Sequence, residues 1–125
     1  MAGKLERVKA DGYTVEATVS SQRLTVLLNG TFDMTAAADL QRFFEGVRAE
    51  VLATTPRDLE IDVSSVYYLG SSCIKAFVTL TAALKDTHRR PNLKVITSAR
   101  LDWQDRTFAV LARLAPEMVT VERTS

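Results

Sequence analysis

Apolar and polar residues alternate along two short stretches near the N-terminus. From Tyr13 to Val19 every second residue is apolar, and after the polar residues 20–23 a second apolar stretch covers residues 24–28. A period of two is typical of a strand with one buried face, because successive side chains point to opposite sides of a sheet. Two such strands joined by a short polar loop predict an antiparallel hairpin.

From Thr35 onward the apolar spacing changes to that of helices. Apolar positions recur at i, i+3, i+4 and i+7 in three segments, which predicts three amphipathic helices. The residues that define the three faces are Leu40, Phe43, Phe44, Val47 and Val51; then Ile74, Phe77, Val78 and Thr81; then Trp103, Thr107, Val110, Leu111 and Leu114. Short apolar runs near residues 59–63, 93–96 and 118–121 alternate with these helices and predict three more strands.

The order of elements, ββαβαβα followed by an edge strand, predicts an α/β layered fold. Strands connected through helices pair in parallel. We therefore expect a mostly parallel sheet of four or five strands, an antiparallel N-terminal edge hairpin and about three main helices. The 125 residues suit one domain, residues 1–125, with a core from about residue 13 to residue 122. In such sheets functional groups gather where loops leave the carboxyl ends of strands, here after Leu28 and between Val63 and Ser72.

The net charge and the lack of targeting signals argue against a nucleic-acid binder and against a secreted or membrane-inserted protein. Sixteen basic and fifteen acidic residues leave a formal charge of +1, which is not the basic excess of a nucleic-acid binder. The first residues contain no apolar signal region, and no apolar run reaches the roughly 18 residues that span a bilayer. Cys73 is the only cysteine, so no internal disulfide can form. We expect a cytoplasmic protein with no nucleic-acid partner and no membrane insertion.

The sequence also lacks the common motifs of enzymes. His88 is the only histidine, so neither a histidine-based metal cluster nor a Ser-His-Asp triad can be assembled. Neither the Gly-x-x-x-x-Gly-Lys phosphate loop nor the Gly-x-Gly-x-x-Gly dinucleotide motif occurs. We therefore expect no catalytic residues, no metal and no cofactor.

Residues 62–73, DVSSVYYLGSSC, carry the most specific pattern in the chain. The segment joins Asp-Val-Ser at 62–64 to Gly-Ser-Ser-Cys at 70–73, and Gly-Thr-Phe-Asp at 30–33 follows the second predicted strand. In these motifs the chain resembles the STAS family, which includes the anti-sigma factor antagonists. That family has Gly-x-x-Asp after its second strand, then Asp-Leu-Ser, an apolar loop and Asp-Ser-Ser-Gly opening a helix. The order of elements agrees over nearly the whole chain.

The resemblance implies a signalling module that binds a protein partner. In the family, an anti-sigma-type serine kinase phosphorylates the first serine of the pair, a PP2C-type phosphatase removes the phosphate, and the unmodified form binds the partner. By position the phosphoacceptor is Ser71, with Ser72 as the alternative. The implied partner-binding residues are Asp33, Tyr67, Tyr68, Gly70, Ser71, Ser72 and Lys75.

Other interpretations of the same residues stay open. Gly70 stands where the family has Asp or Asn, and Cys73 where it has Gly. The missing acid favours an alternative without a phosphorylation cycle: a constitutive STAS subunit of a larger assembly or transport system, or a small-ligand-binding module. Ser71 or Ser72 can instead cap the helix, as Asp33 can cap the preceding one.

The remaining polar and aromatic residues have simpler structural predictions. We expect Cys73 and Trp103 in the core and Asp62 in hydrogen bonds within its loop. Of the adjacent Tyr67 and Tyr68, one is expected to pack inward.

Overall fold

A computed structural model describes residues 5–124. Its elements in chain order are β1 (Val8–Ala10), β2 (Tyr13–Ser20), β3 (Arg23–Phe32), the short 3₁₀ helix η1 (Met34–Ala36), α1 (Ala37–Thr54), β4 (Asp58–Leu69), α2 (Ser71–Lys85), β5 (Asn92–Ser98), α3 (Asp102–Leu114) and β6 (Val119–Thr124).

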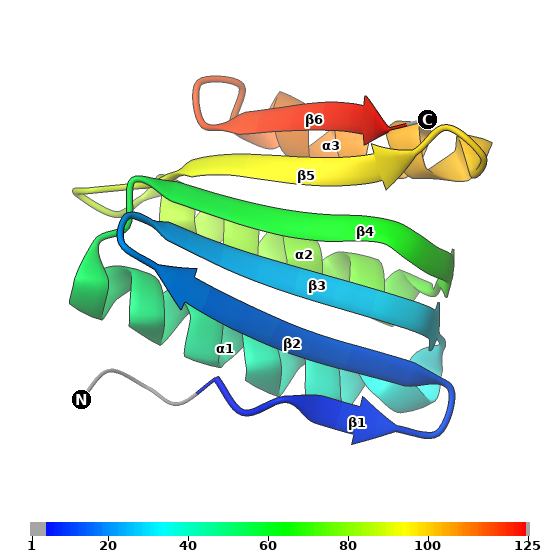
Figure 1. Ribbon diagram of the computed structural model, residues 1–125. Coiled ribbons are helices and arrows are strands. Elements are labelled where there is room, and N and C mark those ends of the chain that lie inside the picture. The colour runs from blue at the N-terminus through cyan, green and yellow to red at the C-terminus, as the bar shows by residue number, and fades with distance from the viewer. Residues whose placement is uncertain (1–4, 125) are drawn as a thin grey trace.

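The strands form one mixed sheet in the order β1-β2-β3-β4-β5-β6. β1, β2 and β3 pair antiparallel, whereas β3 to β6 pair parallel. All three helices lie on the same face of the sheet, so the molecule has two layers (Figure 1). The predicted α/β class, the N-terminal antiparallel hairpin and the parallel remainder are confirmed. The sheet has six strands instead of four or five because Val8–Ala10 adds an edge strand too short to show alternation.

The core lies between the sheet and the helical layer. The first half of β2 and alternate residues of β3 are buried in it, and each helix contributes a phenylalanine. The rings of Phe44 and Phe77 meet edge to face at 4.9 Å, and those of Phe77 and Phe108 at 5.0 Å. Such pairs contribute about 0.5–1.5 kcal/mol each beyond their burial. The three rings therefore join α1, α2 and α3 into one packed layer.

β4 continues well past the predicted strand end. The expected loop between Val63 and Ser72 is wrong, because β4 stays paired with β3 as far as Leu69. Two register shifts give β4 two more residues than β3 over this stretch: Leu27 faces Asp62, but Phe32 faces Leu69. Strict alternation is lost at such irregularities, which is why the strand was not evident from periodicity.

Two glycines bring the first turn against the end of β3. Gly12 and Gly30 have φ angles of +95° and +112°, which L side chains rarely adopt. A Cβ on Gly30 would lie 2.2 Å from the Gly12 carbonyl oxygen. That same oxygen accepts a 2.9 Å hydrogen bond from the Thr31 amide. The close approach fixes the end of β3 just before Asp33.

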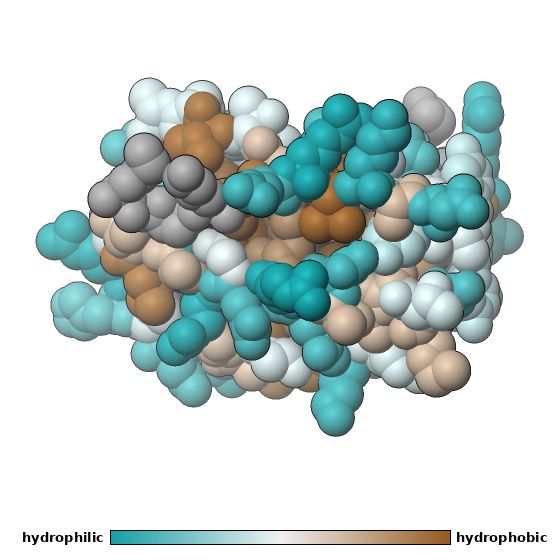
Figure 2. Space-filling model, turned by 90° about the horizontal axis from the view of Figure 1, so that it is seen from below, coloured by the Kyte–Doolittle hydropathy of each residue, from teal (hydrophilic) through white to brown (hydrophobic). Residues whose placement is uncertain are grey.

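The outer surface is mostly polar where β1 and α1 form it. Figure 2 shows this side, on which hydrophilic side chains separate several small hydrophobic patches. Within residues 5–124, no helix is long and apolar enough to cross a membrane.

Candidate functional site

The carboxyl ends of β3 and β4 lie side by side and lead into η1 and α2 (Figure 1). The Gly70 amide donates a 2.8 Å hydrogen bond to the Phe32 carbonyl oxygen, and the Cys73 thiol donates to the Asp33 carbonyl oxygen at 3.5 Å. These bonds hold the end of β3 against the start of α2. Asp33 is therefore placed beside the serine pair, as predicted. We call this part of the molecule the carboxyl edge.

Helix α2 begins at Ser71. Gly70 takes the N-cap position with an extended backbone, and no side chain caps the helix. The interpretation of Ser71 or Ser72 as the cap is therefore wrong, since both are already helical. Ser71 is exposed and Ser72 is half-buried. The first turn of a helix leaves backbone N–H groups free, so an anion on Ser71 would be stabilised there.

Asp33 is confirmed as a helix cap, though for η1 and not directly for α1. Its Oδ1 accepts hydrogen bonds from the Thr35 hydroxyl at 2.6 Å and from the Thr35 amide at 2.9 Å. These bonds lower the pKa of the exposed Asp33 carboxyl. Asp33 therefore keeps a negative charge at the carboxyl edge.

Asp62 has a similar local role within β4. Its Oδ1 accepts hydrogen bonds from the Ser64 hydroxyl at 2.6 Å and the Ser64 amide at 2.9 Å. The predicted structural role is confirmed, but it operates inside an irregular strand and not in a loop.

Tyr67 and Tyr68 both point outward. Their exposed fractions are 64% and 55%, so the expectation that one packs inward is wrong. The extra residues in β4 are the reason: Val66 and Leu69 take the flanking buried positions and leave two consecutive side chains outside. A Cβ added to Gly70 would lie 3.7 Å from the Tyr68 ring, so this tyrosine lies next to the start of α2.

Met34 belongs to the same edge, although the sequence reasoning did not include it. It is the first residue of η1, directly after Asp33, and its exposed fraction is 79%. Its position immediately after the Gly-Thr-Phe-Asp motif was the available signal. Three of the six exposed large apolar residues among those described, Met34, Tyr67 and Tyr68, thus flank the serine pair.

Lys75 lies one turn beyond Ser71 and is exposed. It takes part in none of the ion pairs found among residues 5–124. Side chains at i and i+4 share a helix face, so its ammonium group can reach a phosphate on Ser71.

Cys73 is buried, as predicted. Burial chiefly, and the charge of Asp33 in addition, raise the pKa of its thiol. The residue is therefore a core side chain and not a reactive thiolate. Trp103 is only partly buried, but it packs against the core as expected.

Gln104 is the most important residue that the sequence reasoning missed. Its side chain is fully buried, and its amide nitrogen donates to the carbonyl oxygens of Val63 at 2.7 Å and Val66 at 2.9 Å. Its Oε1 accepts a 2.7 Å hydrogen bond from the Ser98 amide. Gln104 is the third residue of α3, a position from which Gln often bonds backwards to the chain before a helix, and this was the only signal.

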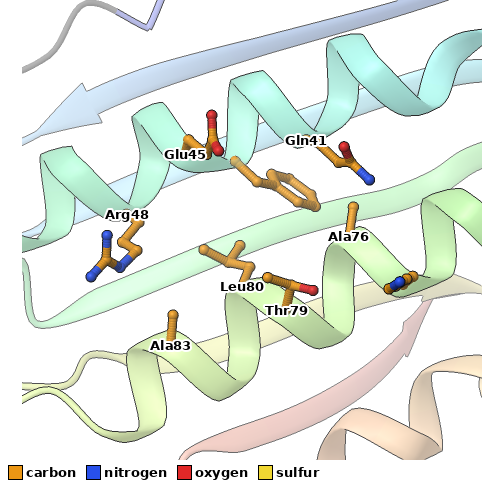
Figure 3. A pocket seen from close by; sticks show the side chains of 9 residues that line it. Gln41, Glu45, Arg48, Ala76, Thr79, Leu80 and Ala83 are labelled. Atoms are coloured by element: carbon orange, nitrogen blue, oxygen red, sulfur yellow. The ribbon is translucent and has the colours of Figure 1, made fainter.

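A groove lies between α1 and α2 (Figure 3). Its volume is about 220 Å³, below the roughly 300–1,000 Å³ of typical ligand pockets. Phe44, Ala76 and Leu80 line it but are almost completely buried by their neighbours, so little apolar surface remains for a ligand. No group of three or more potential metal-binding side chains occurs in the part of the chain that the structure describes.

Comparison with known proteins identifies the fold. No family model and no curated protein matches the sequence. Among solved structures, an anti-sigma factor antagonist from Mycobacterium paratuberculosis superposes with a TM-score of 0.65 and 21% identity over 90% of this chain and 86% of that one. The Bacillus cell fate determinant SpoIIAA in its phosphorylated form superposes with a TM-score of 0.58 and 9% identity, over 86% of this chain and 89% of that one. The anti-sigma factor antagonist SpoIIAA in its unphosphorylated form superposes with a TM-score of 0.57 and 7% identity, over 89% of this chain and 87% of that one. The protein therefore has the STAS-like fold seen in anti-sigma factor antagonists.

Proposed function

We propose that the protein is a non-enzymatic signalling module that binds a protein partner through its carboxyl edge. The observation that carries the proposal is the exposed serine at the start of α2, on the same edge as the exposed Tyr67, Tyr68 and Met34. Tyrosine and methionine are enriched in protein interfaces, where they bury large contact areas. The flanking Asp33 and Lys75 add one charge of each sign at the rim.

Phosphorylation of Ser71 is the proposed switch. A phosphoserine adds about −1.5 to −2 charge, which the free N–H groups of the first turn of α2 stabilise. The fold therefore tolerates the modification. The same charge lies beside the ionised Asp33 and at the centre of the proposed contact surface, where it opposes partner binding. The likeness to SpoIIAA, whose structure is known in phosphorylated and unphosphorylated forms, supports this choice.

The proposed partners come from the resemblance of the motifs to those of the anti-sigma factor antagonists. We infer an anti-sigma-type serine kinase as the protein that binds the unmodified form, and a PP2C-type phosphatase that restores it. A small-ligand module is disfavoured because neither the α1–α2 groove, at about 220 Å³, nor the larger pocket between residues 5–8 and α1, at about 280 Å³, reaches the roughly 300 Å³ of the smallest typical ligand sites. A constitutive subunit of a larger assembly or transport system is the remaining alternative, and it differs by having no phosphorylation cycle.

The proposal is tested by mass and by affinity. Intact-mass measurement of the protein from its native host should show a species heavier by one phosphate, which peptide mapping should place on Ser71. In titrations against anti-sigma-type kinases of the same host, Ser71→Asp should weaken binding by about 2 kcal/mol or more, roughly thirtyfold in Kd. Ser71→Ala should bind like the wild type.

Ser21→Asp is a matched control, because this exposed residue lies in the turn between β2 and β3, at the amino end of β3 and so at the opposite end of that strand from the carboxyl edge. It should leave the affinity unchanged. Equal binding by Ser71→Asp and the wild type, with no phosphate on the native protein, would instead establish the constitutive alternative.

A further inference from the structure

The carboxyl edge depends on a segment of β4 that is paired on only one side. β4 pairs with β5 from Asp58 to Asp62, and the pairing ends there. Its pairing with β3 continues to Leu69. Beyond Asp62, β4 and β5 separate, and we call the space between them the β4–β5 fork. The β4 backbone that faces the fork has lost the strand that would normally accept or donate its hydrogen bonds.

Gln104 fills this fork. Its amide hydrogens go to two carbonyl oxygens of β4, those of Val63 and Val66, and its own oxygen accepts from the Ser98 amide at the end of β5. One side chain from α3 thus replaces the missing ladder bonds and links both strands. A flipped amide would place its oxygen against two carbonyl oxygens, so the network allows one orientation only. No buried side-chain nitrogen or oxygen in the described residues lacks a partner, and this network is complete.

The two carbonyls that Gln104 holds lie within the irregular part of β4. The register with β3 shifts by one residue between Asp62 and Ser65, and by another between Val66 and Tyr68. The Val63 carbonyl therefore lies within the first shift, and the Val66 carbonyl lies at the start of the second. These shifts are what place Tyr67 and Tyr68 outside together. A buried carbonyl without a donor costs about 1–3 kcal/mol, so an unsupported β4 would favour other registers or local opening.

We propose that Gln104 is a positioning residue of the carboxyl edge: it holds the end of β4 in the register that presents Tyr67 and Tyr68 and starts α2 at Ser71. The proposal rests on the proposed function only in treating this edge as a binding surface. It predicts that loss of the Gln104 bonds loosens residues 66–70 while the rest of the sheet stays closed.

The test is residue-resolved hydrogen exchange by NMR on the whole protein. In Gln104→Met, which keeps the length of the side chain but lacks the amide, exchange of residues 66–70 should accelerate about tenfold or more relative to residues 13–19 of β2. The aromatic resonances of Tyr67 and Tyr68 should shift as well. Leu84→Ala is the control, because Leu84 is fully buried near the far end of α2 and its truncation should accelerate all slowly exchanging amides by one common factor.

A second variant keeps the test decisive if Gln104→Met folds poorly. In Gln104→Glu, the protonated acid still donates one hydrogen bond, whereas the ionised carboxylate faces two carbonyl oxygens. The exchange ratio of residues 66–70 to residues 13–19 should therefore rise with pH in this variant and stay constant in the wild type. A ratio that stays at the wild-type value in both variants would overturn the positioning role. That result would not touch the proposed function, whose own failure would appear as unchanged partner affinity in Ser71→Asp.

Discussion

Replacing Gly30 with alanine should destabilise the protein far more than the same change at Gly12. Both glycines have positive φ angles, +112° and +95°. Alanine at either position therefore pays a backbone strain of about 1–3 kcal/mol. The gain from a less flexible unfolded chain, about 0.4–1 kcal/mol, is the same for both and cancels in the comparison.

The two sites differ in the space around the added methyl group. At Gly12 nothing lies within 4 Å of the new Cβ. At Gly30 the Cβ would meet the Gly12 carbonyl oxygen at 2.2 Å and the Tyr13 Cα at 2.9 Å. Both are backbone atoms, so no side-chain rotation relieves the overlap, and overpacking adds about 1–3 kcal/mol or more. We expect losses of about 1–2 kcal/mol for Gly12→Ala and about 3–5 kcal/mol for Gly30→Ala.

Urea unfolding followed by circular dichroism measures both losses. The midpoints should fall in the order wild type, Gly12→Ala, Gly30→Ala, with the slope m unchanged because the same surface is exposed on unfolding. Because domains of this kind have only about 5–15 kcal/mol of stability, Gly30→Ala is best measured in the presence of a stabilising osmolyte. Equal losses in the two variants would refute the argument, because strain alone, without the close approach, would then account for both.

Two further predictions follow from titratable groups. The Tyr13 hydroxyl donates a 2.5 Å hydrogen bond to Asp39, and this bond, with burial and the charge of Asp39, raises the pKa of Tyr13 to about 12. Because the unfolded tyrosine ionises near pH 10, this contribution to the free energy of unfolding is complete below pH 10 and is lost as the pH rises from 10 to 12. Urea unfolding at a series of pH values should therefore show a smaller fall in the free energy of unfolding between pH 10 and 12 for Tyr13→Phe than for the wild type. Burial raises the pKa of the Cys73 thiol, so a disulfide reagent at pH 8 should modify Cys73 only in denaturant, and rapid modification of the native protein would contradict its core position.

The regular parts of the fold could be predicted from local sequence, and the irregular parts could not. Period-two and period-3.6 patterns are properties of consecutive residues, so β2, β3 and the three helices were evident. The outward position of both Tyr67 and Tyr68 depends on how β4 pairs with β3, which local periodicity does not contain. Gln104 acts on residues 38 and 41 positions away, and in the sequence it is only a polar residue on an amphipathic helix.

The candidate site, too, could be predicted only in part from the sequence. The two motifs placed Asp33 and Ser71 at one edge, which the structure bears out through the bonds of Gly70 and Cys73 to the end of β3. The capping role of the serines was wrong because Gly70 itself adopts the extended cap conformation, and a motif does not reveal which of three small residues does so. Met34 was missed because an exposed methionine has no periodic signature.

The irregular features of the molecule converge on the edge that the motifs single out. The register shifts of β4, the Gly12–Gly30 contact, the β4–β5 fork and the uncapped start of α2 all lie at the carboxyl ends of β3 and β4. Thr55, the only described non-glycine residue with positive φ, lies elsewhere, but it is an ordinary left-handed helix C-cap. A fully regular sheet would satisfy the backbone hydrogen bonds of these strands without positive-φ glycines and without a buried side-chain amide. Departures from local rules that concentrate at one place, each with a compensating contact, are typical of functional sites. This distribution favours the carboxyl edge over the α1–α2 groove on grounds independent of the serine motif, because none of these departures falls within the groove.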